Sequence, residues 1–558
     1  DALPISRAIA EAQRDVRRAS GVGSRRATLP RFGPALDRVY THLTTKGVAD
    51  ANLQRPAEWF LDNYYIVRRV ARQVAQDLPR EFTRHLPLIA AGEDEGLSRI
   101  EALARELIAR KGIELDRATL DGFIVSYQKE VPLSIAELWA LPTMLRAAML
   151  GSLLAYLAAL KVPGDAPGGG ADWPARGLKS RPDLDPSVGV ERSIRELRLL
   201  AEIDWQAFFE EHSCVEAVLL SDPAGVYSSM DFDTCDDYRK AVEELAWATR
   251  TPEQDVARQA VRLARAAPRN SRRGHAGFYL VGEGRSELEA NIGFRPRGLE
   301  RVRRLVRQFP TLAYLLPVTI LTAAPLLTAW WYATYVSQVV FSPLARAVLV
   351  GTCLLAAPPI WSAGSMIMQW FFAKLLPPRR LPKLDYSEGV PDDARTLVVM
   401  PTLLARTEDI DGMLQQLERH YLSNPDPMLG FALLTDYLDS IEPQKESQLL
   451  ESAANGITLL NARHGDGETG PFLLLHREPR WNPAEGRFMG WERKRGKLDE
   501  LNRLLRGDKT TTFAHRLGDP SRLQDIRFVI TLDSDTELPL GAAHRLIGLL
   551  SHPLNRAV

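Results

Sequence analysis

The chain has 558 residues, of which 45% are hydrophobic and 25% charged, and its formal net charge is +0. One ordinary hydrophobic core does not hold so many residues, so we expect several domains. The composition excludes intrinsic disorder, and the balanced charge excludes a globally basic nucleic-acid-binding protein. The three cysteines form no CxxC pair, and their odd number indicates neither a zinc site nor a disulfide framework. A reduced, cytosol-facing location fits best.

Both ends of the sequence indicate a fragment of a longer reading frame. The chain does not begin with methionine, and residues 1–6 (DALPIS) resemble the translation of a sequencing adapter, so the fold prediction starts at residue 7. At the other end, the chain stops at Val558 directly after a helix-like run. We therefore expect a carboxy-terminal remainder of the same protein.

Helical periodicity dominates residues 7–162, the predicted helical amino-terminal region. Within it, Ser134 and Glu137 have the spacing of a capping box for a helix over residues 136–160. That helix is apolar enough to raise the question of a membrane span. Arg146 at its middle would cost roughly 2.5–3.5 kcal/mol in a bilayer, so we predict a buried soluble helix.

A linker and a second helical region follow. Residues 163–187 are rich in Pro, Gly and Asp without an apolar period, which predicts a linker. Residues 188–300 are predicted to be helical, except that residues 277–281 (GFYLV) resemble a strand or an extended connector. Three histidines of the helical regions lie among apolar neighbours and are interpreted as structural: His85, His212 and His275.

Two uncharged segments predict a transmembrane helical hairpin over residues 311–376. No charged residue occurs between Arg307 and Arg346 or from 347 to 373, and each run exceeds the roughly 20 residues that cross a bilayer as a helix. Basic residues lie on both outer flanks: Arg301, Arg303, Arg304, Arg307, Lys374, Arg379, Arg380 and Lys383. The positive-inside rule therefore places both flanks in the cytoplasm. The alternative is a buried hairpin in a soluble protein.

Strands and helices alternate over residues 385–558, which predicts an α/β domain with a parallel sheet. We expect a strand at 396–401, a helix at 409–421 and a strand at 429–434 that leads into Asp436. Ligands of such sheets bind beyond the carboxyl ends of the strands. Asp436 is at such an end.

An acidic pair, Asp533 and Asp535, directly follows the predicted strand at 526–532. Two carboxylates separated by one residue can share a hard divalent ion that keeps open positions for diphosphate oxygens and water. Such an ion would neutralise a leaving nucleoside diphosphate. The same residues would be unremarkable in a surface turn, but their place after a buried strand favours a metal site.

A basic run at residues 491–498 (WERKRGKL) leads into a predicted helix at 499–505. Its cations could bind a diphosphate, and Gly496 would let the backbone approach closely. The alternative is a solvated basic start of a helix. We favour Lys497, next to the glycine, as the main contact.

These motifs resemble those of the cyclic β-1,2-glucan synthases. The resemblance covers nearly the whole chain after residue 6 and is carried by several segments. They are residues 62–65 (DNYY), 137–142 (ELWALP), 222–227 (DPAGVY), 230–232 (MDF), 274–280 (GHAGFYL), 491–498 with 500–502 (ELN), 532–536 (LDSDT) and 552–555 (HPLN).

The resemblance implies an α/β GT-A-like (Rossmann-like) glycosyltransferase portion, incomplete here, after the hairpin and the all-α region. It implies glucosyl transfer from UDP-glucose to a growing β-1,2-glucan chain, with Mg or Mn, at the cytoplasmic face of a bacterial inner membrane. Asp436 would bind the nucleotide, Lys497 the diphosphate side, and Asp533 with Asp535 the metal. Processive glucan synthases of similar fold also use a later acidic general base and a Gln-Arg-Trp acceptor motif. Both would lie beyond Val558, so we expect this chain to be inactive alone.

Two other functions would also account for some of these features. Haloacid-dehalogenase-like phosphotransferases also place Asp-x-Asp after a strand, but they expect Thr or Val two positions after the second Asp, where this chain has Glu537. A membrane-anchored non-catalytic scaffold would keep the transferase shape without its chemistry. Metal-dependent UDP binding separates the scaffold from the enzyme.

Overall fold

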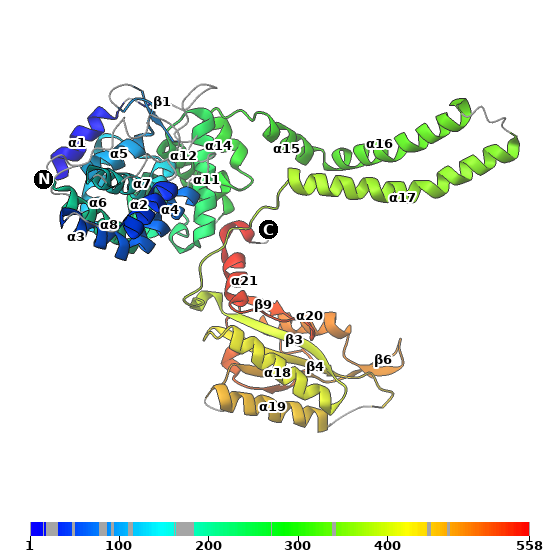
Figure 1. Cartoon of the computed structure of the whole chain (residues 1–558). Coiled ribbons are helices and arrows are strands. Elements are labelled where there is room, and N and C mark those ends of the chain that lie inside the picture. Colours follow the sequence, from blue (N-terminus) through cyan, green and yellow to red (C-terminus); the bar gives the residue numbers. More distant parts are fainter. Residues whose placement is uncertain are drawn as a thin grey trace. The chain divides into compact units, whose positions relative to one another are not determined.

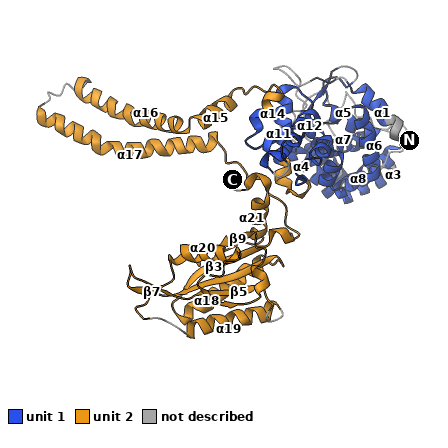
Figure 2. Cartoon of the chain, turned by 180° about the vertical axis from the view of Figure 1, so that it is seen from behind, with its two compact units in different colours: residues 1–227, 237–288 blue, residues 228–236, 289–558 orange. Residues whose placement is uncertain are grey.

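A computed structural model of the chain describes residues 2–14, 16–17, 32–46, 51–77, 86–90, 94–109, 115–160, 162, 184–268, 271–336, 342–442, 448–465 and 469–556. The chain divides into two compact units (Figure 2). Unit 1 comprises residues 1–227 and 237–288, and unit 2 comprises residues 228–236 and 289–558.

Unit 1 is almost entirely helical, as the sequence predicts (Figure 1). Two short antiparallel strands accompany the helices, β1 (Val16–Arg17) and β2 (Leu88–Ile89). The helices that lie wholly or mostly in unit 1 are α1 (Ala2–Ala12), α2 (Phe32–Lys46), α3 (Ala51–Asp62), α4 (Tyr64–Asp77), α5 (Arg99–Ala109), α6 (Arg117–Glu130), α7 (Ile135–Ala159), α8 (Pro186–Glu202), α9 (Trp205–His212), α10 (Cys214–Leu219), α11 (Phe232–Thr249), α12 (Glu253–Ala266), α13 (Ala276–Leu280) and α14 (Arg285–Asn291).

The long apolar helix α7 lies inside unit 1. The predicted capping box is confirmed, because the Ser134 side chain accepts from Glu137 N while Glu137 Oε2 accepts from Ser134 N at 2.9 Å. Its most apolar stretch is 72% buried by the rest of the structure, as expected for a buried helix. Arg146 lies 3.9 Å from Asp77. Asp77 is thus the ion-pair partner of Arg146, the charged residue that makes a membrane span unfavourable for this helix.

Helix α8 packs against α7, so helices from both sides of the predicted linker share one unit. A Cβ on Gly189 would lie 2.6 Å from the ring of Tyr156, which shows how closely the two helices approach. Most of the predicted linker, residues 163–183, lies outside the described residues. Residues 2–6, at the predicted adapter, form the start of α1.

The expected strand or extended connector at residues 277–281 is wrong, because residues 277–280 belong to helix α13 and Val281 is its C-cap. Every residue of α13 is buried. A short apolar run fits a strand and a buried helix equally well, so periodicity alone could not separate them. A Cβ on Gly277 would lie 1.9 Å from Tyr238 Oη, so the glycine permits the tight packing.

Unit 2 begins with three helices, α15 (Leu299–Gln308), α16 (Pro310–Trp331) and α17 (Pro343–Leu375). Helices α16 and α17 run side by side (Figure 1), and the rings of Tyr314 and Phe372 lie 6.1 Å apart. Both are long and apolar enough to cross a membrane. Only 6% and 0% of their most apolar stretches are buried, in contrast to α7.

A five-stranded sheet forms the core of unit 2, with the strand order β8-β5-β4-β3-β9. The strands β3 (Thr396–Leu404), β4 (Leu429–Tyr437), β5 (Phe472–Arg477) and β9 (Phe528–Thr531) are parallel, and β8 (Phe513–Leu517) is antiparallel at one edge. A separate hairpin pairs β6 (Arg480–Asn482) with β7 (Arg487–Met489). The predicted parallel sheet is confirmed.

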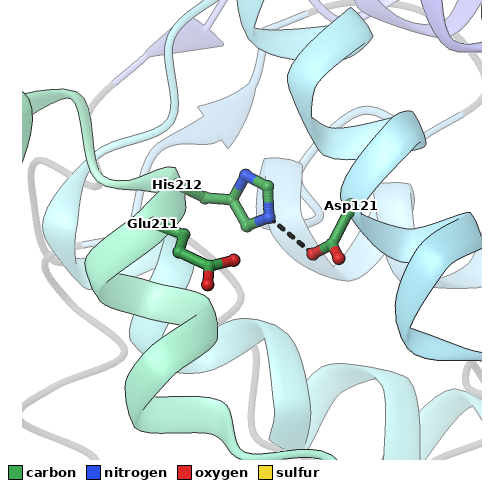
Figure 3. Close-up of side chains that lie close together, drawn as sticks. All are labelled: Asp121, Glu211 and His212. Carbon is green, nitrogen blue, oxygen red and sulfur yellow. Dashed lines mark hydrogen bonds and ion pairs between the residues drawn. The ribbon is translucent and has the colours of Figure 1, made fainter.

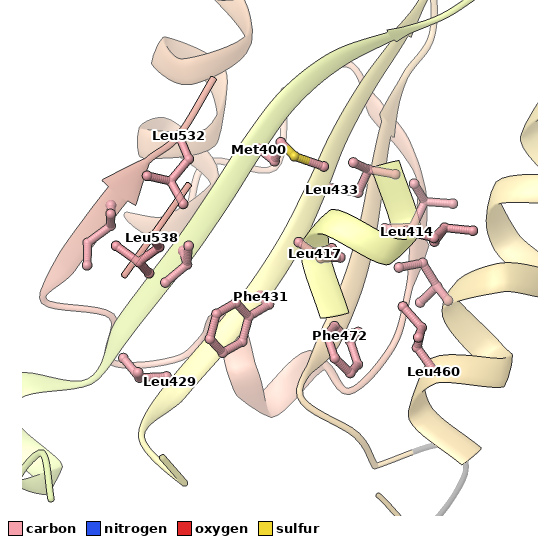
Figure 4. Packing of buried hydrophobic residues seen from close by; sticks show 14 of the residues in the cluster. Met400, Leu414, Leu417, Leu429, Phe431, Leu433, Leu460, Phe472, Leu532 and Leu538 are labelled. Carbon is pink, nitrogen blue, oxygen red and sulfur yellow. The ribbon is translucent and has the colours of Figure 1, made fainter. Parts of the chain in front are cut away.

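Alternating side chains of the strands build a hydrophobic core on each face of this sheet. In β3, Leu397 and Val399 point to one face, which is covered by α20 (Arg493–Leu505). Val398 and Met400 belong to the core on the other face, where Figure 4 shows Met400. That face is covered by three helices: α18 (Thr407–Ser423), α19 (Gln448–His464) and α21 (Ala542–Ser551). Burial on both faces explains why the strands are continuous apolar runs in the sequence.

The segment 228–236 joins unit 2 through contacts far apart in the sequence. Met230 pairs with Leu384 in an isolated bridge, and His552 Nε2 lies 3.3 Å from the Met230 sulfur. Lys383 Nζ lies 3.1 Å from the Asp231 carboxylate. Two segments that carry the family resemblance, 230–232 and 552–555, therefore meet.

Truncation of Leu417 tests the assignment of this core. Leu417 is fully buried, whereas Leu422 on the same helix is 56% exposed. Leu417→Ala should destabilise unit 2 by about 2–5 kcal/mol, and Leu422→Ala by less than about 0.5 kcal/mol. Hydrogen exchange of the β3 and β4 amides of the whole chain, followed with added denaturant, measures both. Equal losses in the two variants would contradict the core described above.

Candidate functional site

The candidate residues gather where the parallel strands end. Strand β4 ends with Asp436 and Tyr437, and the neighbouring β5 ends with Arg477. Strand β9, on the other side of β3, ends at Thr531, two residues before Asp533. Because parallel strands bring their carboxyl ends to one edge of the sheet, these side chains share that edge.

Four charged side chains form a buried cluster at this edge, called here the charged cluster: Asp436, Arg477, Lys497 and Glu500. Arg477 donates through Nε and Nη2 to the two oxygens of Asp436, both at 2.7 Å. Its Nη1 lies 3.2 Å from Glu500, and Lys497 Nζ lies 3.1 Å from Asp436. Each side chain is at most 4% exposed. Two cations therefore neutralise two anions inside the fold.

Lys497 reaches this cluster from the first turns of α20 and is held there by protein oxygens. Its ammonium donates to the carbonyl oxygens of Thr402 at 2.5 Å and Leu434 at 3.3 Å, in addition to Asp436. Burial lowers the pKa of Lys497 to about 8, while the negative charge of Asp436 opposes this shift. The lysine therefore joins the ends of β3 and β4 to α20.

Arg477 and Glu500 shape the chain on both sides of α20. Arg477 donates to the carbonyl oxygens of Trp491 and Arg493, each at 3.0 Å. Glu500 accepts from the backbone N of Thr512 at 2.7 Å and from its hydroxyl at 2.6 Å. The cluster thus fixes the turn before α20 as well as the start of β8.

The turn into α20 is strained. Glu492 and Arg493 have φ angles of 51° and 45°, in the left-handed region that favours glycine, and each such residue costs on the order of 1–3 kcal/mol. A Cβ on Gly496 would lie 1.9 Å from the carbonyl oxygen of Trp491, so only glycine fits there. The hydrogen bonds from Arg477 offset part of this strain.

Asp533 and Asp535 are both exposed just beyond β9. The backbone N of Thr536 donates to Asp533 O at 2.9 Å and closes the turn that carries them. The Asp533 carboxylate pairs with the ammonium of Lys494, an exposed residue on the first turn of α20. A cationic group thus already lies against this carboxylate. Two hard oxygen donors with open surroundings fit a divalent ion such as Mg²⁺ or Mn²⁺.

The structure brings Asp436 and Lys497 together, but it buries both. The predicted role of Lys497 as a diphosphate contact stays a prediction, as do the roles of Asp436, Asp533 and Asp535. Sequence reasoning missed Arg477, although it ends a buried strand as Asp436 does. It also favoured Lys497 over Lys494, although Lys494, one helical turn earlier, is the lysine that lies beside the acidic pair.

A second group of possible metal ligands lies in unit 1: Asp121, Glu211 and His212 (Figure 3). One ligand atom from each lies within 4.8 Å of the other two. The guanidinium of Arg117 pairs with both carboxylates, at 2.8 Å from Asp121, and His212 Nε2 lies 2.7 Å from the same aspartate. This arrangement is an ion-pair network between α6 and α9, which agrees with a structural His212.

His275 is also structural. Its Nδ1 lies 2.7 Å from the Asp222 carboxylate and its Nε2 lies 2.8 Å from Tyr238 Oη, all three side chains being buried. The third histidine of the prediction, His85, lies outside the described residues.

Loss of Arg477 should unfold the strand-end edge. Arg477→Met leaves Asp436 and Glu500 short of a buried counter-charge, which costs about 3–5 kcal/mol. Arg495→Met is the control, because Arg495 is 86% exposed on α20, and it should cost less than about 0.5 kcal/mol. Denaturant unfolding of the whole chain, read by hydrogen exchange in β4 and β5, measures both. A stable Arg477→Met variant would overturn the role given to the cluster.

Acid should weaken unit 2 through His476, which is 1% exposed. Its Nδ1 lies 2.9 Å from Thr435 Oγ1, and its Nε2 has no hydrogen-bond partner within the described structure. Burial lowers the pKa of His476 to about 4. As the pH falls, the unfolded chain therefore binds a proton at His476 before the folded chain does. The contribution of neutral His476 to the free energy of unfolding is fully present above about pH 6.5, and about 3 kcal/mol is lost toward pH 4.

The slope of stability against pH measures this effect. His476→Gln should flatten the slope between the two pKa values, whatever its effect at neutral pH. His42→Gln, in α2 of unit 1, should leave the slope of unit 2 unchanged. A slope that does not respond to His476→Gln would contradict the assignment.

No family model matches the chain. A curated relative, the cyclic β-(1,2)-glucan synthase NdvB of Rhizobium meliloti (strain 1021), is 31% identical over 593 aligned positions. The alignment takes in 93% of this chain and 20% of that protein, so the chain spans about a fifth of the length of its relative. Identity at this level across nearly the whole chain agrees with the motifs that resemble the family. The chain belongs to the cyclic β-1,2-glucan synthase family.

Proposed function

We propose that the sheet of unit 2 is the donor-binding part of a GT-A-like glycosyltransferase. It transfers glucose from UDP-glucose to a growing β-1,2-glucan chain, with Mg²⁺ or Mn²⁺ as cofactor. Family membership supports this function, as does a parallel sheet whose polar residues gather at the carboxyl ends of its strands.

The single observation that carries the proposal is the pairing of Asp533 with Lys494 at this edge. An acidic pair that can hold a divalent ion lies there beside an exposed lysine that can reach phosphate oxygens. A nucleoside diphosphate carries negative charge that needs both kinds of group. When bound, the metal ion would supply charge neutralisation of the leaving diphosphate.

The chain's own residues divide into two layers. Asp533, Asp535 and Lys494 are exposed, and we propose that they face the metal and the diphosphate. Asp436 and Lys497 remain nucleotide-side residues in this proposal. Because protein partners already occupy their charged groups, they act by fixing the end of β4 and the start of α20.

We further propose that α16 and α17 cross the bacterial inner membrane as a hairpin, with the amino terminus and the sheet on the cytoplasmic side. Their apolar stretches are almost unburied within the structure, which a lipid bilayer would cover. Basic residues flank both outer ends, among them Arg303 before α16 and Arg379 after α17. The positive-inside rule assigns these ends to the cytoplasm.

Calorimetric titration of the whole chain in detergent with UDP tests the donor site. UDP should bind when Mn²⁺ is present and not when it is removed, because the ion joins the acidic pair to the diphosphate. Asp535→Asn should weaken binding by roughly 10–100-fold or more, since even residues that only orient metal ligands contribute that much.

Asp525→Asn provides the matched control. Asp525 is exposed just before β9, whereas Asp535 lies beyond the opposite end of that strand. The same chemical change there should leave UDP binding unaltered. UDP binding that needs no metal, or that survives Asp535→Asn, would refute the proposed donor site and favour a non-catalytic scaffold.

A further inference from the structure

Helix α15, which directly precedes α16, carries an apolar face that the described protein does not cover. None of its residues is buried. The exposed apolar residues recur at helical spacing, with Leu299 55%, Val302 47%, Leu305 59% and Phe309 49% exposed. At about 100° per residue they fall on one stripe of roughly 120°, together with Val306.

Arginines border this stripe on both sides. By the same helical spacing, Arg301 lies at one border and Arg303 at the other, with Arg307 next to Arg303. Within the described part of the chain, none of these three forms an ion pair with a carboxylate. Arg304, on the polar face, pairs with Glu289 at 2.7 Å and Glu300 at 3.0 Å. The uncompensated positive charge therefore lies at the edges of the apolar stripe.

Helix α15 is held at the end of the α16–α17 pair. Its last residue, Gln308, is separated from Pro310 of α16 only by Phe309, whose φ of −125° and ψ of 61° break the helix. Arg303 Nε donates to the carbonyl oxygen of Leu375, the last residue of α17, at 2.9 Å. The stripe is thus continuous in sequence and in contact with the proposed membrane hairpin.

We propose that α15 lies in the plane of the membrane surface, with its stripe in the acyl region and Arg301 and Arg303 on the phosphates of anionic lipids. The inference rests on the proposed membrane crossing of α16 and α17. Long arginine side chains at the border of an apolar stripe can reach headgroups while their stems stay in the apolar layer. Two borders of one sign match the negative surface of a cytoplasmic leaflet.

Nitroxide labels at single cysteines in the whole chain test the position of α15. The background carries Cys214→Ser, Cys235→Ser and Cys353→Ser, and the chain is placed in vesicles of phosphatidylcholine with phosphatidylglycerol. A label on Leu305→Cys should collide with oxygen and be protected from a water-soluble nickel complex. A label on Gln308→Cys, on the polar face, should show the reverse.

A third label separates failure of the membrane proposal from failure of this inference. Leu355 of α17 is 81% exposed, and Leu355→Cys should report the acyl region. If this label meets the nickel complex, the hairpin itself is not inserted and the inference falls with it. The inference is overturned in two cases in which the Leu355→Cys label does report lipid. If the Leu305→Cys label meets the nickel complex, α15 lies in water. If the Leu305→Cys label is shielded from both reagents, α15 lies against protein.

Lipid selectivity tests the role of the arginines. The preference of the chain for spin-labelled phosphatidylglycerol over spin-labelled phosphatidylcholine should fall about fivefold in Arg301→Gln. Arg304→Gln removes a charge that two carboxylates already compensate, so the preference should remain. Circular dichroism verifies that each variant keeps its helices. Equal losses in the two variants, or no loss in Arg301→Gln, would overturn the assignment of the border arginines.

Discussion

The bidentate ion pair between Arg477 and Asp436 is the interaction on which the strand-end edge of unit 2 depends. It joins the last residue of β5 to the end of β4. The remaining donors of Arg477 hold the carbonyls of the strained turn before α20. Lys497 and Glu500 then complete a neutral set of buried charges. One guanidinium therefore fixes two strands, a turn and a helix.

This arrangement separates a buried layer of charged residues from an exposed one. Gly490 belongs to the buried layer, since a Cβ there would lie 2.5 Å from Arg477 and 2.8 Å from Asp436. Asp533 and Lys494 lie in the exposed layer and can exchange their mutual contact for other charged groups. In general, a second set of residues that holds the first set in place fixes the positions of ligand-binding groups accurately.

Helices α7, α16 and α17 show how little composition says about environment. Their most apolar stretches have mean hydropathies of 1.4, 1.8 and 1.6, yet 72%, 6% and 0% of these stretches are buried. Helix α7 is surrounded by other helices of unit 1, and the partner of its Arg146 is Asp77. The other two turn their apolar side chains outward, where α15 adds a stripe bordered by arginines.

The sequence alone determined the strands β3, β4 and β9, the acidic pair after β9 and the capping box of α7, because local periodicity and strand ends encode them. Only the tertiary structure decided that α13 is a helix, that Arg477 is the partner of Asp436, and that Lys497 is buried while Lys494 meets Asp533. The two ion pairs join residues that lie 41 and 39 positions apart in the sequence, and no local pattern specifies such a pairing.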